Sequence, residues 1–175
     1  MYKKILIAID GSPTSDKVLA SVINVAGAGA TIRVIYVVED PITSLPSLYG
    51  EYYDVEPVRE ALVAEGHKLL ALAKARLLAK GFDAKTHLID LRQLGGDTPE
   101  AIKAEVTAWA ADLTILGTHG RRGVRRLLLG SVAEHFMRIS DGPVLLIRSG
   151  ERPSVSAGLS AAIIQSAPSL ETDHA

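Results

Sequence analysis

Glycine, serine and arginine residues gather in one segment, Gly117–Val132, at spacings that suit phosphate binding. A short apolar run precedes the segment, so Gly117 and Gly120 follow the end of a predicted strand. Glycine lets the backbone turn sharply and lets a ligand approach without a Cβ in the way. Gly130 and Ser131 then begin a predicted helix, whose first N–H groups and partial positive charge attract anions. The segment therefore predicts a site for phosphate groups.

The charged side chains of this segment have two interpretations. Four arginines lie between the glycines and add positive potential to an anion site. Arg122, Arg125 and Arg126 fit an ordinary solvated surface equally well. Glycines after a strand are also common turn residues, and Ser131 with Glu134 matches a capping box that needs no ligand. The combination of strand, paired glycines, basic loop and helix start favours the anion site.

Five apolar, mostly β-branched runs alternate with helical patterns along the chain. They predict strands at Ile5–Ile9, Thr31–Val38, Ala84–Leu91, Leu113–Leu116 and Val144–Ile147, most of them nearly continuous, as in strands buried on both faces of a parallel sheet. Helices are predicted from Ser12-Pro13 to about Ala28, from Glu56 to about Lys80, from Thr98-Pro99 to about Ala110 and from Ser131 to about Ile139. The alternation predicts an α/β fold, a doubly wound parallel sheet with helices on both faces.

Several familiar nucleotide-binding and catalytic motifs are absent. The sequence holds no Gly-x4-Gly-Lys-Ser/Thr, so no P-loop lysine accompanies the glycines. Asp10-Gly11-Ser12-Pro13 stands where a dinucleotide fingerprint would follow the first strand. No serine lies in a nucleophile elbow, and the histidines outside the glycine segment show no metal-ligand spacing. With no obvious general base, fast hydrolysis of a nucleotide is not expected.

The segment resembles the spacing Gly-x2-Gly-x9-Gly-Ser/Thr of the ATP-binding branch of the universal stress protein family. Gly117, Gly120, Gly130 and Ser131 occupy its four positions, and the opening Lys4–Ser12 is similar to the first strand and acidic turn of the family. The similarity covers roughly residues 2–149. It implies a Rossmann-like five-stranded parallel sheet in the order 3-2-1-4-5, and a homodimer.

The resemblance also implies a site for ATP, with Mg²⁺ held through the phosphates and near Asp10 rather than by direct protein ligands. Asp10 would approach the ribose or the metal, Ala8 would border the nucleoside and the backbone of Val37 would meet adenine. The ribose and phosphates would contact Leu116, Gly117, His119, Gly120, Gly130, Ser131 and Val132. The carboxyl ends of the first, second and fourth strands are also where open α/β sheets bind ligands. Asp10 could instead be a turn residue, and His119 an ordinary loop histidine.

These features predict an ATP-binding regulatory module that acts in the stress response, with an unknown protein partner. The alternatives are a slow ATPase or phosphotransferase assisted by Asp10 and His119, and a dimeric interaction protein that binds no nucleotide. The four-position motif argues against the last of these, and the missing lysine and general base argue against an enzyme. We assign no catalytic residue.

Composition limits the classes of protein that fit. The chain has 175 residues, of which 47% are hydrophobic, enough for one domain with a buried core. A net charge of −1 gives no basic field for nucleic acid. No cysteine, signal-like leader or apolar run of about 20 residues is present, so a cytoplasmic protein without a membrane span is expected.

Three segments carry further expectations. Residues 1–149 are predicted to form the nucleotide-binding domain and residues 150–175 a mobile tail. The loop Asp40–Val55, rich in Pro, Ser and Tyr, is expected to be mobile without ligand and to lie near adenine. Val144–Ile147 would be an apolar edge strand in a monomer, and such edges are paired or covered. We therefore expect the homodimer to form through this last strand.

Overall fold

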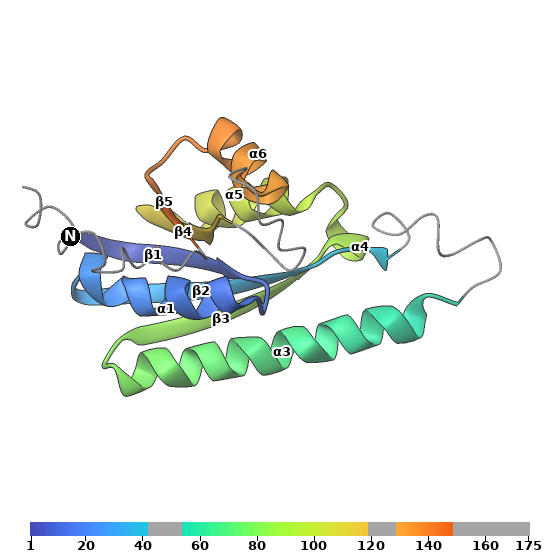
Figure 1. Ribbon diagram of the computed structural model, residues 1–175, viewed down its shortest axis with the longest axis horizontal. Helices are drawn as coiled ribbons and strands as arrows, with labels where there is room; N and C mark the ends of the chain where they lie inside the picture. The colour runs from blue at the N-terminus through green and yellow to red at the C-terminus, as the bar shows by residue number, and fades with distance from the viewer. Residues whose placement is uncertain (42–53, 119–128, 149–175) are drawn as a thin grey trace, which may run out of the picture.

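All five strands of the sheet are parallel, in the order β3-β2-β1-β4-β5 (Figure 1). The structure, a computed structural model, describes residues 1–41, 54–118 and 129–148. The strands are β1 Tyr2–Ile9, β2 Ala26–Val38, β3 Asp83–Asp90, β4 Leu113–Gly117 and β5 Val144–Ile147. The helices are α1 Pro13–Val25, α3 Glu56–Ala79, α4 Leu91–Leu94, α5 Thr98–Trp109 and α6 Ser131–Ile139. The predicted fold class and strand order are confirmed.

Alternate side chains of each strand enter two different cores. Ile5 and Ile7 of β1 pack with Val18 of α1 and with α3 on one face of the sheet. Leu6, between them, packs with Phe136 of α6 and with α5 on the other face. Figure 1 shows α3 along one side of the sheet and α5 and α6 on the opposite side. Because both faces are covered, the central part of the sheet is apolar on both sides, whereas the edge strand β3 is exposed over much of its length and carries Asp83, Lys85 and His87.

A glycine lets helix α3 lie unusually close to the sheet. Gly66 faces the buried ring of Tyr36 on β2, and a Cβ on Gly66 would come within 2.6 Å of Tyr36 Cδ1. It would also lie 2.9 Å from Leu88 Cδ1 on β3. Both distances are far below ordinary carbon contacts, so the position needs glycine although glycine weakens a helix interior.

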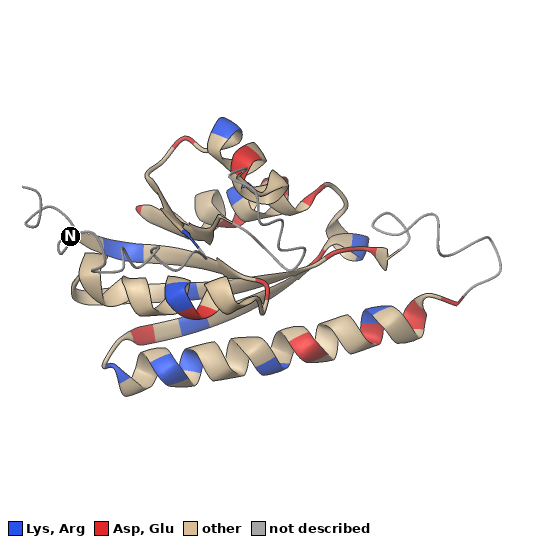
Figure 2. Cartoon of the chain, viewed as in Figure 1, with Lys and Arg blue, Asp and Glu red and all other residues tan. Residues whose placement is uncertain are grey.

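The charges along α3 follow the direction of its dipole. Acidic side chains gather near its start and basic ones toward its end (Figure 2). Glu56 lies in the first turn and Arg76 in the last. Acidic groups are favourable at a helix N-terminus and basic groups at its C-terminus. The helix ends at Ala79, close to the predicted end at about Lys80, and Gly81, with φ +82°, follows in the left-handed conformation common after a helix.

Two helix boundaries differ from those predicted. Helix α1 ends at Val25 rather than near Ala28, because Ala26 already pairs with Tyr2 as the first residue of β2. Helix α5 is capped by Asp97 rather than by Thr98. The Asp97 carboxylate accepts from the Glu100 N–H at 2.9 Å, and the Glu100 side chain accepts from the Asp97 N–H, a complete capping box.

Candidate functional site

The carboxyl ends of β1, β2 and β4 lie side by side at the centre of the sheet. Ala8 of β1 pairs with Ile35 of β2, and Ile7 pairs with Ile115 of β4. The side chains of Ala8, Val37, Leu116 and Val132 belong to one apolar cluster on the α5 and α6 face. The structure thus brings together four of the residues predicted to surround the nucleotide.

Helix α6 begins directly beside the end of β4. The Gly130 N–H donates to the Thr118 carbonyl oxygen at 2.8 Å, and the Thr118 N–H donates to the Ile147 carbonyl oxygen at 2.8 Å. Gly117, the last residue of β4, pairs with Ile147 of β5. These bonds hold the first turn of α6 at the carboxyl edge of the sheet, where its N–H groups and the dipole favour an anion.

The start of α6 differs from the predicted capping box. Gly130, with φ −62° and ψ 149°, is the N-cap, and Ser131 is the first helical residue, with an exposed side chain. Glu134 does not reach back to the cap, because its Oε1 pairs with Arg138 Nη2 at 2.6 Å. Within the described residues, no side chain accepts a hydrogen bond from the first turn of α6. The Gly130 carbonyl oxygen accepts from the Glu134 N–H at 2.9 Å, so the cap lies one residue earlier than the sequence pattern indicated.

Asp10 organises the turn between β1 and α1. Its Oδ1 accepts from the Ser12 N–H at 3.0 Å and from the Ser15 hydroxyl at 2.9 Å. The Asp10 N–H donates to Ser15 Oγ at 3.1 Å, so the two residues are bonded twice. Gly11 follows with φ +78°, a conformation that favours glycine. The turn role considered for Asp10 is therefore present, at the same edge of the sheet as Gly117 and Gly130.

Comparison with known proteins decides the family. The profile of the Universal stress protein family matches residues 1–148. This chain belongs to the universal stress protein family. Universal stress protein MJ0531 of Methanocaldococcus jannaschii is 34% identical over 154 residues, which are 87% of this chain and 85% of the relative. The predicted family is confirmed.

Solved structures share the fold of this family member. The hypothetical protein MJ0577 superposes with a TM-score of 0.73 at 24% identity, over 87% of this chain and 99% of its own. A universal stress protein solved in complex with cAMP superposes with a TM-score of 0.56 at 22% identity, over 85% of this chain and 98% of its own. At these identities the likeness shows the fold alone.

Parts of the predicted site lie outside the described residues. These are His119 and Gly120, the four arginines of the glycine segment, most of the loop Asp40–Val55 and the tail 150–175. In the described ranges, no three His, Asp or Glu side chains are grouped so as to hold a metal ion. None of the helices in those ranges is long and apolar enough to span a membrane.

A charged network at the end of β3 was not predicted from the sequence. Arg59 of α3 pairs with the buried Asp90 and, at 2.6 Å, with Glu56, which also pairs with Arg92. The hydrogen bonds that the Arg59 guanidinium donates to Asp90, and then to Glu56, raise the pKa of Arg59 above its ordinary value. The network ties the start of α3 to the carboxyl edge of the sheet. Asp90 and Arg59 are 31 positions apart, so no local pattern could reveal the pair.

The described parts of the site offer groups that suit a phosphate and a base. They are backbone groups of β4 and α6, small or apolar side chains, and one carboxylate, Asp10, bonded into a turn. Backbone N–H groups at a helix start attract phosphate, and an apolar wall suits a flat base.

Proposed function

We propose that this member of the family binds ATP, with Mg²⁺ held through its phosphates, and acts as a nucleotide-dependent regulatory module in the stress response. The observation that carries the proposal is the bond from the Gly130 N–H to the Thr118 carbonyl at 2.8 Å. It puts the N-terminus of α6 at the edge of the sheet where the phosphates would lie. The cAMP bound by a structural neighbour supports an adenine nucleotide as the ligand class.

The proposed site assigns one part of the ligand to each element. Gly130, Ser131 and Val132 would hold the phosphates through their N–H groups and the Ser131 hydroxyl. Asp10 would approach the ribose or the metal, and Ala8 and Val37 would border the nucleoside. Leu116, Gly117, His119 and Gly120 would complete the wall around the ribose and phosphates. The alternatives are slow hydrolysis of the bound ATP and an interaction protein that binds no nucleotide.

The test is titration calorimetry of the intact protein with ATP and Mg²⁺, and with ADP, AMP, cAMP and inorganic phosphate separately. Gly130→Val is the decisive variant, since its extended φ and ψ accept valine but the new side chain would block the approach of phosphate. Gly142→Val is the matched control, because an added Cβ there meets no atom within 4 Å. We expect binding to be lost in the first variant only.

Wild-type affinity for ATP in a folded Gly130→Val protein would contradict the site. Tight binding of cAMP with no binding of ATP would support the proposed site but show that its ligand is cAMP rather than ATP. Turnover of ATP is measured on the same samples by phosphate release, which separates a regulatory module from a slow ATPase. Thermal melts of each variant show whether a loss of binding is a loss of fold.

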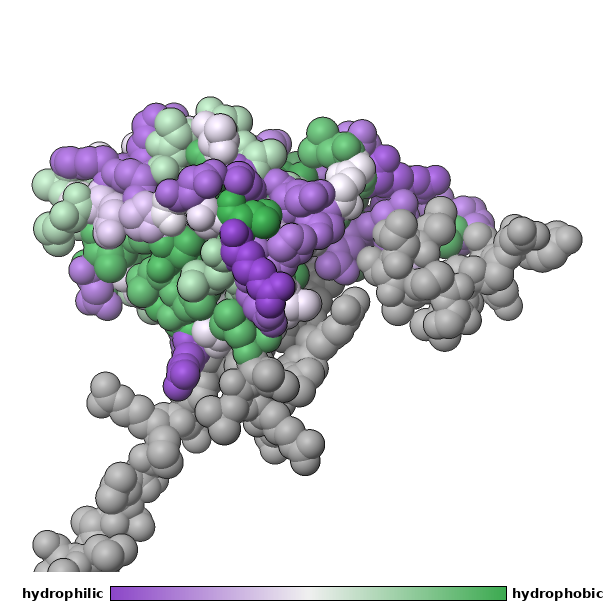
Figure 3. Space-filling view, turned by 90° about the horizontal axis from the view of Figure 1, so that it is seen from above, coloured by the Kyte–Doolittle hydropathy of each residue, from purple (hydrophilic) through white to green (hydrophobic). Residues whose placement is uncertain are grey.

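We also propose a homodimer formed through the exposed edge of β5. The carbonyl oxygens of Pro143 and Ile147 accept from the N–H groups of Thr114 of β4 and of Thr118, the residue after β4. Since the direction of the backbone groups alternates along a strand, the N–H and C=O of Val144 and Leu146 point away from β4. Hydrophobic residues gather along this side of the molecule (Figure 3), and all of β5 is only half-buried. Such an edge is a ready template for a second copy.

A further inference from the structure

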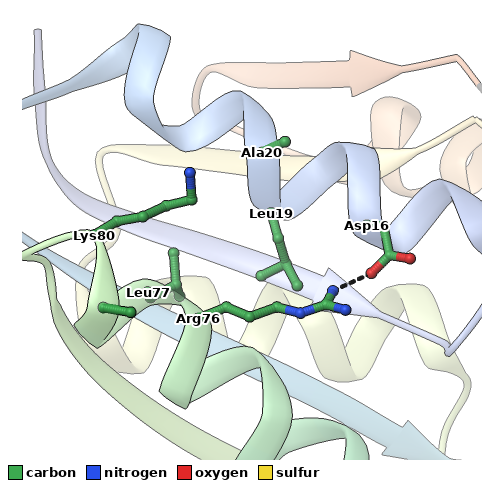
Figure 4. A pocket seen from close by; sticks show the side chains of 7 residues that line it. Asp16, Leu19, Ala20, Arg76, Leu77 and Lys80 are labelled. Carbon is green, nitrogen blue, oxygen red and sulfur yellow. Dashed lines mark hydrogen bonds and ion pairs between the residues drawn. The ribbon is translucent and has the colours of Figure 1, made fainter.

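A hollow of about 380 Å³ lies between α1 and α3, on the face of the sheet opposite the proposed nucleotide site. Leu19 and Ala20 of α1 and Leu77 and Ala79 of α3 give it apolar walls. Asp16 and Arg76 form an ion pair across one end, and Figure 4 shows Leu19 and Leu77 beside the Arg76 side chain. The hollow is therefore an apolar groove that the ion pair between Asp16 and Arg76 crosses at one end.

Exposed apolar side chains extend this groove in both directions. Ile23 lies four residues after Leu19 on α1 and is 51% exposed. Leu72 lies four residues before Arg76 on α3 and is also 51% exposed. Residues four apart share one face of a helix, so both continue the line of the groove. Together with Leu19, Ala20, Leu77 and Ala79, they form a line of apolar side chains along the two helices that a second apolar segment could cover.

The sequence beyond β5 contains a matching apolar stripe. Val155, Leu159, Ala162 and Ile163 recur at the spacing i, i+4, i+7 and i+8, which places them on one face of a helix. Polar residues and glycine occupy most of the positions between them. Such a stripe has no partner within its own segment, so it needs an apolar surface elsewhere.

The chain is long enough to bring the stripe to the groove. Helix α1 packs directly against β5, the last strand before this segment. Packed helices lie about 8–10 Å apart, and seven extended residues reach up to about 23 Å. The residues between Arg148 and Val155 therefore suffice to cross α1. A tethered segment also has an effective concentration of the order of millimolar, which favours it over a free partner.

We propose that the segment Val155–Ile163 docks along the groove between α1 and α3 of its own chain. Leu159 and Ile163 fill the hollow lined by Leu19 and Leu77. Lys80, which has no ion-pair partner among the described residues, lies at the rim, and its charge is opposite to that of Glu171 and Asp173 farther along the tail. The docked segment covers the face opposite the nucleotide site.

Disulfide trapping in the full-length protein tests the docking, because the natural chain contains no cysteine. One variant carries Ala20→Cys, in the groove, with Ile163→Cys. The control carries Ala104→Cys, an exposed alanine of α5 on the other face, with the same Ile163→Cys. Both pairs share the same Ile163→Cys and the same tether, so the two rates compare the two faces of the sheet directly. We expect the groove pair to close at least about tenfold faster in dilute protein.

Two further variants of the trapped pair test the stripe. Leu159→Asp, in the stripe, should reduce the rate of closure to that of the control. Ala157→Asp, on the other side of the predicted helix, should leave the rate unchanged. Equal rates for the groove pair and its control would overturn the proposal. Disulfides formed mainly between two chains would also overturn it, because the occupant would then be the tail of a second copy.

Discussion

The backbone N–H of Gly130 donates to the carbonyl oxygen of Thr118 at 2.8 Å, so the first turn of α6 is attached to the end of β4. Gly130, and not Ser131, is the N-cap of the helix, because the Gly130 carbonyl oxygen accepts the first intrahelical bond from the Glu134 N–H at 2.9 Å. Capping and phosphate binding, which the sequence pattern both assigned to Ser131, therefore fall on different residues. The hydroxyl of Ser131 is exposed and is available to a ligand rather than used as a cap.

Ser131→Ala should weaken ATP binding without changing stability. The substitution removes one hydroxyl but keeps the N–H, so the expected loss of binding free energy is about 0.5–2 kcal/mol. Because Ser131 does not cap α6, the melting temperature should stay within error of the wild type. Calorimetry and thermal melts measure the two effects. A lower melting temperature with unchanged affinity would show that the hydroxyl supports the helix instead.

Asp10→Asn should separate the turn role of Asp10 from a role in binding. Asparagine keeps an oxygen that accepts from the Ser12 N–H and the Ser15 hydroxyl, so the turn should persist. It removes the negative charge that would attract Mg²⁺, so affinity for ATP with Mg²⁺ should fall. Ser15→Ala is the matched control, since it disturbs the turn and leaves the charge. Equal affinity in the wild type and Asp10→Asn would confine Asp10 to the turn.

Gly66→Ala should destabilise the protein, although the same change usually stabilises a helix. Alanine is favoured over glycine in helices by about 0.5–1 kcal/mol. At this position the Cβ would lie 2.6 Å from Tyr36 Cδ1, and overpacking a core costs typically about 1–3 kcal/mol. Urea denaturation gives the free energy of unfolding, with Gly142→Ala as the control. A gain in stability would mean that Tyr36 moves aside at little cost.

Leu146→Pro should abolish the dimer while the fold persists. Its N–H points away from β4, so proline removes a bond to a second copy but none to β4. Leu146→Ala shortens the side chain and keeps the N–H, and should remain dimeric if backbone pairing holds the two copies together. Light scattering at micromolar concentration reports the mass. A wild-type protein that is monomeric under these conditions would refute the dimer.

Much of the architecture could be predicted from local patterns. The continuous apolar runs indicated strands buried on both faces, and β5 spans the predicted Val144–Ile147. The strand order 3-2-1-4-5 was implied by the resemblance to the family, and the structure confirms it. Helix α3 ends within one residue of the predicted Lys80, because a helix stop such as Gly81 depends on residues that are neighbours in the chain.

The sequence by itself determined the elements, the family and which segments reach the carboxyl edge of the sheet, because these follow from periodicity and short motifs. Only the tertiary structure decided how those elements meet. The bond from Gly130 to Thr118, the pair of Arg59 with Asp90 and the close approach of Gly66 to Tyr36 each join residues distant in the sequence. Contacts of this kind depend on where packing places whole helices and strands, so no local pattern encodes them.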